Sequence, residues 1–170
     1  HGTPSGIDNT VIVYEQPVYF IREQPIERLT INQPFTLLIA DTGQSALTRI
    51  SVADVRKLYE STPKTVMPIL ERIGQISRQA RDIITSREPL QLGPLMDENH
   101  QLLQRLTVSS DELDHLVEVA RAAGALGAKL SGGGRGGNMI ALVKPTDAPQ
   151  VQQALLDAGA SRVFQTTVGE

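Results

Sequence analysis

Apolar residues recur along the chain with two different spacings, which predicts a mixture of strands and helices. Residues 35–41, FTLLIAD, form a nearly continuous apolar run that is closed by a Thr-Gly pair. A run of this kind is typical of a buried central strand. Short β-branched and aromatic runs precede it and are separated by prolines, which indicates strands at the edge of a larger unit. They are residues 11–13, 18–22 and 28–31.

Helical spacing follows the central strand. A first helix is predicted to begin near Thr48 and to end before Pro63. The longest helix is predicted over residues 63–86, because Thr62 and Pro63 supply an N-cap and a first-turn proline. The inward-facing stripe of the first helix is expected to consist of Ile50, Val52, Val55, Leu58 and Tyr59.

Two more helices are predicted before the glycine-rich part of the chain. The third helical region covers residues 89–106, where the Gly93-Pro94 pair should kink or break the helix. Ser109 and Glu112 match a capping box, which predicts the start of a fourth helix.

The last third of the chain begins with a glycine-rich stretch. Residues 124–137 hold seven of the fourteen glycines and are predicted to form a loop. A strand is predicted over 139–144, a helix over 147–158 and a final strand over 161–167. This order lacks regular βαβ alternation and predicts an α+β fold, in which helices pack on one face of an antiparallel sheet.

Composition narrows the functional classes. The 170 residues carry a formal net charge of -3 and no basic run, which argues against a general nucleic-acid surface. The absence of cysteine excludes a disulfide framework and a thiolate metal site, so a cytoplasmic location is expected. The longest apolar stretch, residues 139–143, is far shorter than a membrane-spanning helix. Because the chain starts inside a turn and without methionine, we interpret it as a C-terminal fragment.

The opening segment, HGTPSGIDN, concentrates turn residues in front of one carboxylate. Proline at the second position and glycine at the fourth predict a type I turn over residues 3–6, immediately before Asp8. Such a turn can direct the Asp8 side chain into a cleft. On these residues alone, capping of the segment that follows is the more common role for Asp8 and Asn9.

Residues 132–137, GGGRGG, are the second candidate site. Glycines leave the backbone N–H groups unshielded, so the stretch can form an anion-binding nest or allow another segment to approach closely. No Gly-Lys-Ser/Thr follows, and the predicted helix precedes the glycines, so the motif is neither a Walker loop nor a dinucleotide fingerprint. A flexible tether is the alternative, and the tight flanking by GAKLSG and an apolar strand argues against it.

A third group comprises Asp41, Thr42 and Gly43 with Thr48. These residues follow a strand and precede a helix, so they can either meet a substrate group or serve in a turn and an N-cap. His100 and His115 lack a companion at metal-ligand spacing, which favours surface or packing roles. The Asp97-Glu98 pair is interpreted as a solvated helix face.

Taken together, these segments resemble the superfamily of galactokinase, homoserine kinase, mevalonate kinase and phosphomevalonate kinase, and its mevalonate kinase branch in particular. HGTPSGIDNTV resembles the segment that carries the catalytic aspartate, and GAKLSGGGRGGNMIALV resembles the third, glycine-rich motif. IADTG, ALTRISVADVR, LGPLMDENHQLL and LTVSSDELDHLVEVARAAGALGAKL stand between them in the family's order.

The resemblance implies a fold and a reaction. It implies that residues 1–33 end a truncated, ribosomal-S5-like N-terminal domain and that residues 34–170 form a ferredoxin-like C-terminal domain. The implied reaction transfers the γ-phosphate of ATP to the primary hydroxyl of mevalonate, with Mg²⁺ as cofactor. The resemblance implies two partners for this chain, the substrate mevalonate and a missing N-terminal half. That half is expected to supply the magnesium ligands, a lysine that pairs with the aspartate and a phosphate-binding loop. Members of the family often form dimers.

The resemblance also assigns residues. Asp8 is the catalytic carboxylate, with a role in orienting the attacking hydroxyl and accepting its proton late. Substrate-binding roles fall to His1, Gly2, Ser5, Gly6 and Thr48, and the phosphate region to Gly132, Gly133, Gly134, Arg135, Gly136 and Gly137. Arg135 departs from the family pattern, which has glycine or alanine there, and either reaches the phosphates or projects into solvent. A sibling kinase for another hydroxy acid or sugar, or a non-catalytic binding module, remains the alternative.

Overall fold

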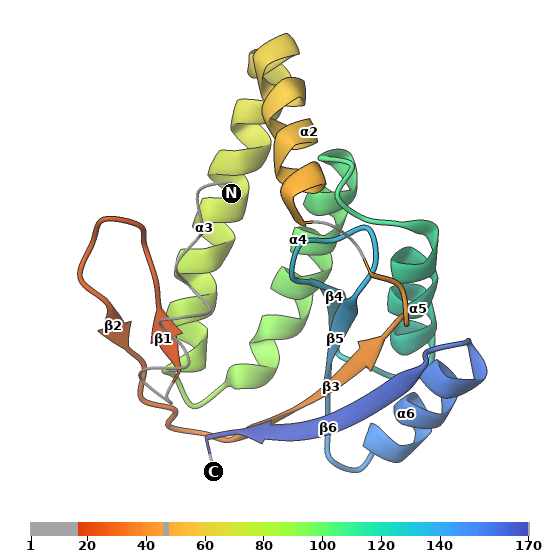
Figure 1. The fold of residues 1–170 in the computed structure, drawn as a ribbon. Helices are drawn as coiled ribbons and strands as arrows, with labels where there is room; N and C mark the ends of the chain where they lie inside the picture. Colours follow the sequence, from red (N-terminus) through yellow and green to blue (C-terminus); the bar gives the residue numbers. More distant parts are fainter. Residues whose placement is uncertain (1–16, 46–47, 170) are drawn as a thin grey trace.

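The computed structural model describes residues 17–45 and 48–169. A four-stranded antiparallel sheet lies at the base of the molecule, with strand order β4-β5-β3-β6 (Figure 1). Its strands are β3 (Phe35–Asp41), β4 (Gly127–Ser131), β5 (Asn138–Val143) and β6 (Arg162–Val168). The order and the two crossovers are those of a ferredoxin-like α+β fold with extra helices in the first crossover. The predicted α+β class is therefore confirmed, although helices contact both faces of the sheet and not one alone.

Strand β3 occupies a central position, as its apolar sequence predicts. It pairs with β5 along one side and with β6 along the other, so that Leu38 lies opposite both Ala141 and Gln165. Leu38 and Ala40 are completely buried. Since successive residues of a strand point to opposite faces, Leu37 and Ile39 project from the other face of the sheet.

Helices α5 (Asp111–Ala122) and α6 (Ala148–Asp157) cover one face of the sheet. The core of this layer joins the two helices to alternate residues of β3, β4 and β5. Ser110 caps α5, because its side chain accepts a hydrogen bond from the Leu113 amide. The capping box predicted with Ser109 as N-cap is therefore wrong by one residue. The Ser109 hydroxyl instead donates to the Asp114 carboxylate.

The remaining helices lie beside this sheet and against its second face. Helices α2 (Thr48–Ser61) and α3 (Pro63–Ile84) form an antiparallel pair that rises from the sheet (Figure 1). A short 3₁₀ turn, η1 (Pro89–Gln91), leads into α4 (Leu92–Arg105). The end of α3 and the start of α4 pack against part of the second face of the sheet, around Leu142.

Two predictions about these helices are wrong in detail. Ile50 and Val52 were expected to face inward, but 47% and 57% of their surface is exposed. Helix α2 packs chiefly against α3, so it buries only a narrow stripe that includes Val55. The chain does not break at Pro94, because α4 starts at Leu92 and the proline occupies its first turn. An amide is not needed at that position of a helix.

Strand β4 lies within the stretch that the glycine content predicted to be a loop. Position 127 requires a glycine, since a Cβ atom there would come within 2.1 Å of the Gly93 carbonyl oxygen. Helix α4 therefore approaches β4 backbone to backbone. The true loop is confined to residues 132–137.

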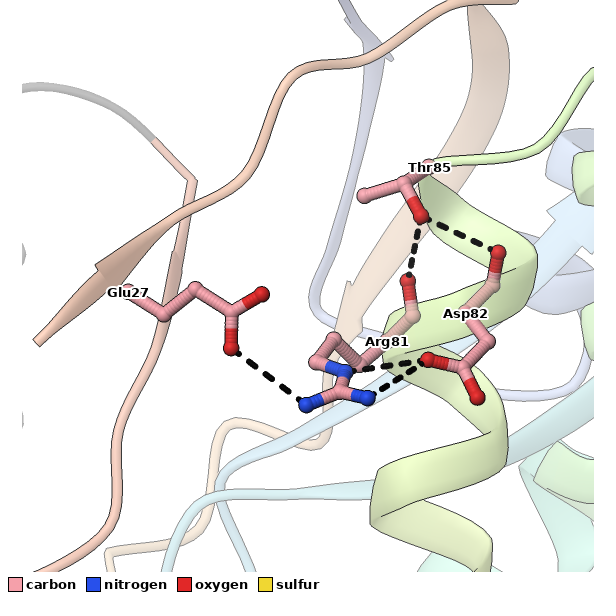
Figure 2. A network of polar contacts seen from close by, with 4 residues as sticks. All are labelled: Glu27, Arg81, Asp82 and Thr85. Carbon is pink, nitrogen blue, oxygen red and sulfur yellow. Dashed lines mark hydrogen bonds and ion pairs between the residues drawn. The ribbon is translucent and has the colours of Figure 1, made fainter.

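A small hairpin precedes the sheet, formed by β1 (Val18–Tyr19) and β2 (Glu27–Arg28). Both strands are shorter than predicted, and the run at residues 11–13 lies outside the described residues. Arg81 of α3 holds the hairpin, because its guanidinium pairs with Glu27 at 3.4 Å (Figure 2). The guanidinium also lies over the Tyr19 ring. The same guanidinium binds Asp82, and the Thr85 hydroxyl donates to the carbonyls of both helix residues.

The described part of the chain contains no helix that is long and apolar enough to span a membrane. The division into residues 1–33 and 34–170 stays a prediction.

Candidate functional site

The glycine loop, residues 132–137, connects β4 to β5 at one corner of the sheet. Three segments that are distant in sequence surround it. They are the start of α2, the residues that follow α4, and the link between β3 and α2. The loop is therefore a packed element of the fold, and the alternative of a flexible tether is wrong.

Gly133 faces Thr48, the first residue of α2. A Cβ atom at Gly133 would lie 2.4 Å from Oγ1 and 2.9 Å from Cβ of Thr48. Real Cβ atoms essentially never approach other heavy atoms this closely. The structure thus brings together two residues that the sequence assigned to different parts of the site.

Gly134 fixes the other side of the loop. Its φ of +72° is a conformation that glycine adopts without strain, and a Cβ atom there would lie 1.8 Å from the Val108 carbonyl oxygen. The same carbonyl accepts a hydrogen bond from the Arg135 amide at 2.9 Å. The residues after α4 therefore hold the loop by its backbone.

The link between β3 and α2 completes the enclosure. The Thr42 amide and hydroxyl donate to the Gly137 carbonyl at 2.9 and 3.0 Å, and the Gly137 amide donates to the Gln44 carbonyl at 2.8 Å. Asp41 is also engaged, because its carboxylate accepts from the Gly43 amide and from Arg162. Those two bonds hold the pKa of Asp41 below its usual value. Of the two roles considered for Asp41, Thr42 and Gly43, the structure supports the one in the turn.

Arg135 is bound to protein groups. Its guanidinium lies 2.6 Å from the Asp54 carboxylate of α2, and Nε donates to the Thr107 carbonyl at 3.0 Å. The bond from Arg135 lowers the pKa of Asp54. Arg135 itself has a φ of +58°, which is rare for a residue with a side chain. The arginine thus ties the glycine loop to α2 and to the end of α4.

Two side chains of α4 accept hydrogen bonds from backbone amides of the edge strand β4. The Asp97 carboxylate accepts a hydrogen bond from the Ala128 amide at 2.9 Å, and Nδ1 of His100 accepts one from the Leu130 amide at 3.3 Å. Asp97 and His100 lie one helical turn apart, and the two amides lie two residues apart on one strand edge. The interpretation of Asp97 and Glu98 as a solvated face is wrong for Asp97, which binds the Ala128 amide. Glu98 remains partly exposed and forms a two-pronged bond to Arg72.

His100 is a packing residue, one of the roles that its isolation in the sequence predicted. It is buried, and Nε2 lies 3.1 Å from Oδ1 of Asp114. Burial lowers the pKa of His100, although Asp114 opposes the shift. A neutral ring is also what the bond from the Leu130 amide requires, because Nδ1 must carry a free lone pair. His100 thereby positions β4 just before the glycine loop.

The other candidate residues, His1, Gly2, Ser5, Gly6 and Asp8, lie outside the described residues. Within residues 17–45 and 48–169, no group of three or more His, Cys, Asp or Glu side chains could hold a metal ion. Sequence reasoning missed Asp54, Thr107 and Val108 as supports of the loop. The one available indication was an arginine inside a run of glycines, since a partly buried guanidinium needs an acceptor.

Comparison with known proteins finds similarity to one kinase family over part or most of the chain. Residues 80–161 match the family described as GHMP kinases C terminal. The mevalonate kinase of Pyrococcus furiosus is 39% identical over 165 residues, which cover 94% of this chain and 48% of that protein. The mevalonate kinase of Aeropyrum pernix is 33% identical over 171 residues, covering 100% of this chain and 52% of its own length. The chain thus spans about half the length of the relatives it matches.

Solved structures show the same fold. The crystal structure of L. major mevalonate kinase in complex with R-mevalonate superposes with a TM-score of 0.92 at 33% identity, over 99% of this chain and 53% of that one. Phosphomevalonate kinase of Streptococcus pneumoniae superposes with a TM-score of 0.80 at 17% identity, over 97% of this chain and 56% of that one. The second likeness concerns the fold alone.

Proposed function

Because the chain carries the C-terminal domain of the GHMP kinases, we propose that it forms the C-terminal part of a mevalonate kinase. That enzyme would transfer the γ-phosphoryl group of ATP to the primary hydroxyl of mevalonate. Relatives named mevalonate kinase and a similar structure that holds R-mevalonate support this substrate. The observation that carries the proposal is the glycine loop, which is packed against Thr48 where no side chain fits.

The glycine loop fits a phosphate group. The amides of Arg135 and Gly137 already donate to carbonyl groups, so the N–H groups left to meet an anion are those of the other loop glycines. Glycine allows the backbone to approach a phosphate without side-chain interference. We assign the loop, Gly132–Gly137 without the Arg135 side chain, to the phosphates of ATP. Arg135 supports the loop from behind through Asp54 and Thr107.

Thr48 is assigned to the substrate side of the site. It stands at the first turn of α2, where backbone N–H groups carry partial positive charge. Its hydroxyl lies directly over the glycine loop. A threonine at that point can hydrogen-bond a hydroxyl or carboxylate of mevalonate beside the phosphates.

Asp8 is assigned the catalytic role on its motif. An aliphatic alcohol is too weak an acid for a carboxylate to deprotonate in advance, so Asp8 would orient the hydroxyl and accept its proton as the phosphoryl group transfers. His1, Gly2, Ser5 and Gly6 would shape the pocket around it. When bound, Mg²⁺ would neutralise charge on the transferring phosphates, and its ligands are assigned to the part of the enzyme outside this chain.

A substrate panel tests the proposal. A longer natural chain that contains these 170 residues, which the proposal assumes, is assayed with ATP and Mg²⁺ against mevalonate, phosphomevalonate, homoserine and galactose. We expect turnover of mevalonate with a kcat/KM at least a hundredfold above the others. Preference for another alcohol would establish a sibling kinase, and ATP binding without turnover of any substrate would establish a binding module.

A further inference from the structure

A cavity that takes no part in the proposed reaction lies beside α4. It has a volume of about 300 Å³ and lies between α3, α4 and β4. Its walls are almost wholly apolar, with Ile73, Ile76 and Ala80 from α3 and Leu92, Leu95 and Met96 from α4. Three polar side chains also line it: Ser77, Asn99 and Lys129.

Lys129 is the unusual member of this lining. Its ammonium donates to the Leu130 carbonyl at 2.6 Å, and no acidic side chain of the described residues forms an ion pair with it. Burial lowers the pKa of Lys129 to about 8. A cation in apolar surroundings is unfavourable unless an anion accompanies it. The cavity thus combines apolar walls with one positive charge that forms no ion pair within the described residues.

We propose that this cavity binds an amphiphilic monocarboxylate, whose head pairs with Lys129 and whose aliphatic chain lies between α3 and α4. The volume suits such a ligand, because 300 Å³ corresponds to about ten water-sized atoms at roughly 30 Å³ each. Octanoate has about that many non-hydrogen atoms. Ser77 and Asn99 also line the cavity and can hydrogen-bond a polar group of the ligand. The site is independent of the proposed kinase activity.

Three probe ligands separate the contribution of the Lys129 charge from that of the apolar walls. Isothermal titration and ligand-observed NMR are carried out on the full 170-residue chain with octanoate, octanol and acetate. We expect octanoate to bind at least tenfold more tightly than octanol, because only octanoate carries the charge. Acetate should not bind detectably, since it lacks the chain that fills the apolar walls.

Two variants locate the site. Lys129→Met keeps the aliphatic volume and removes the charge, so it should weaken octanoate binding at least tenfold and leave octanol binding unchanged. Ala80→Leu fills the apolar part, so it should weaken both ligands. Circular dichroism confirms that each variant is folded.

Several results would overturn the proposal. Equal octanoate affinity in the parent and Lys129→Met would remove the charge from the argument, and unchanged affinity in Ala80→Leu would place the ligand elsewhere. Failure of octanoate to bind the folded chain would overturn it directly. Binding to the 170-residue chain but not to the longer natural chain would show that another part of the protein covers the cavity.

Discussion

Substituting Gly133 by alanine tests the packing at the centre of the site. The new Cβ atom would lie 2.4 Å from Oγ1 of Thr48, whereas ordinary van der Waals contact begins near 3.4 Å. Relief therefore requires Thr48 or the loop to move by about 1 Å, the difference between these two distances. Gly133 has no positive φ, so an alanine there would meet steric overlap and no backbone strain.

The size of the effect follows from this displacement. Overpacking of a well-packed site typically costs about 1–3 kcal/mol. Thr48 lies at the exposed end of a helix and can yield, so we expect a loss of about 1–2 kcal/mol in the free energy of unfolding. A shift of about 1 Å in a substrate-positioning group can lower activity by a factor of about one hundred. Activity should therefore suffer more than stability.

Urea unfolding of the 170-residue chain measures the first quantity, and steady-state kinetics of the longer natural chain measure the second. Gly74→Ala is the matched control, because its Cβ atom would meet nothing nearer than 3.7 Å. The double variant Gly133→Ala with Thr48→Gly lacks the Thr48 side-chain atoms that the new Cβ atom would meet. It should therefore recover most of the stability lost in Gly133→Ala alone. If Gly133→Ala unfolds at the parent's urea concentration, or if the double variant recovers nothing, the proposed contact is refuted.

The other predictions concern the supports of the site. Gly93→Ala should destabilise the chain by more than about 2 kcal/mol, because its Cβ atom would lie 2.2 Å from a backbone carbonyl oxygen. Gly74→Ala should instead add about 0.5–1 kcal/mol, and urea unfolding distinguishes the two signs. The free energy of unfolding should fall as the pH drops below about 6.5, because unfolded His100 then gains a proton that the folded residue resists. His100→Gln should flatten that part of the profile, and an unchanged profile would assign it to other groups. Arg135→Ala and Asp54→Asn should lower the melting temperature non-additively, since both break one ion pair. Additive losses would show that the pair is not coupled.

The elements with regular apolar spacing could be predicted from the sequence. Residues 35–41 and the long helix after Thr62 follow local patterns of burial, and their structure needs no information from elsewhere in the chain. Strand β4 could not be predicted in the same way. Its glycine serves the close approach to Gly93, and its edge amides are satisfied by Asp97 and His100, about 30 residues earlier.

The candidate site shows the same division. The run of glycines marked a loop of unusual backbone at residues 132–137, although the predicted loop began too early. The assignment of Thr48 to the substrate stays a prediction. The contact between Thr48 and Gly133 depends on the fold, and so does the ion pair between Arg135 and Asp54, which lie 81 residues apart in the sequence. A carboxylate at position 54 looks like any other polar residue of an amphipathic helix. Only tertiary structure identifies it as an anchor of the loop.

The most direct test of the proposed function is the turnover of mevalonate by the Asp8→Asn variant of the longer natural chain. The account predicts that kcat falls at least a hundredfold while the KM for ATP changes little, because Asp8 acts on the hydroxyl and the glycine loop binds the nucleotide. Near-normal kcat with mevalonate in Asp8→Asn would contradict it.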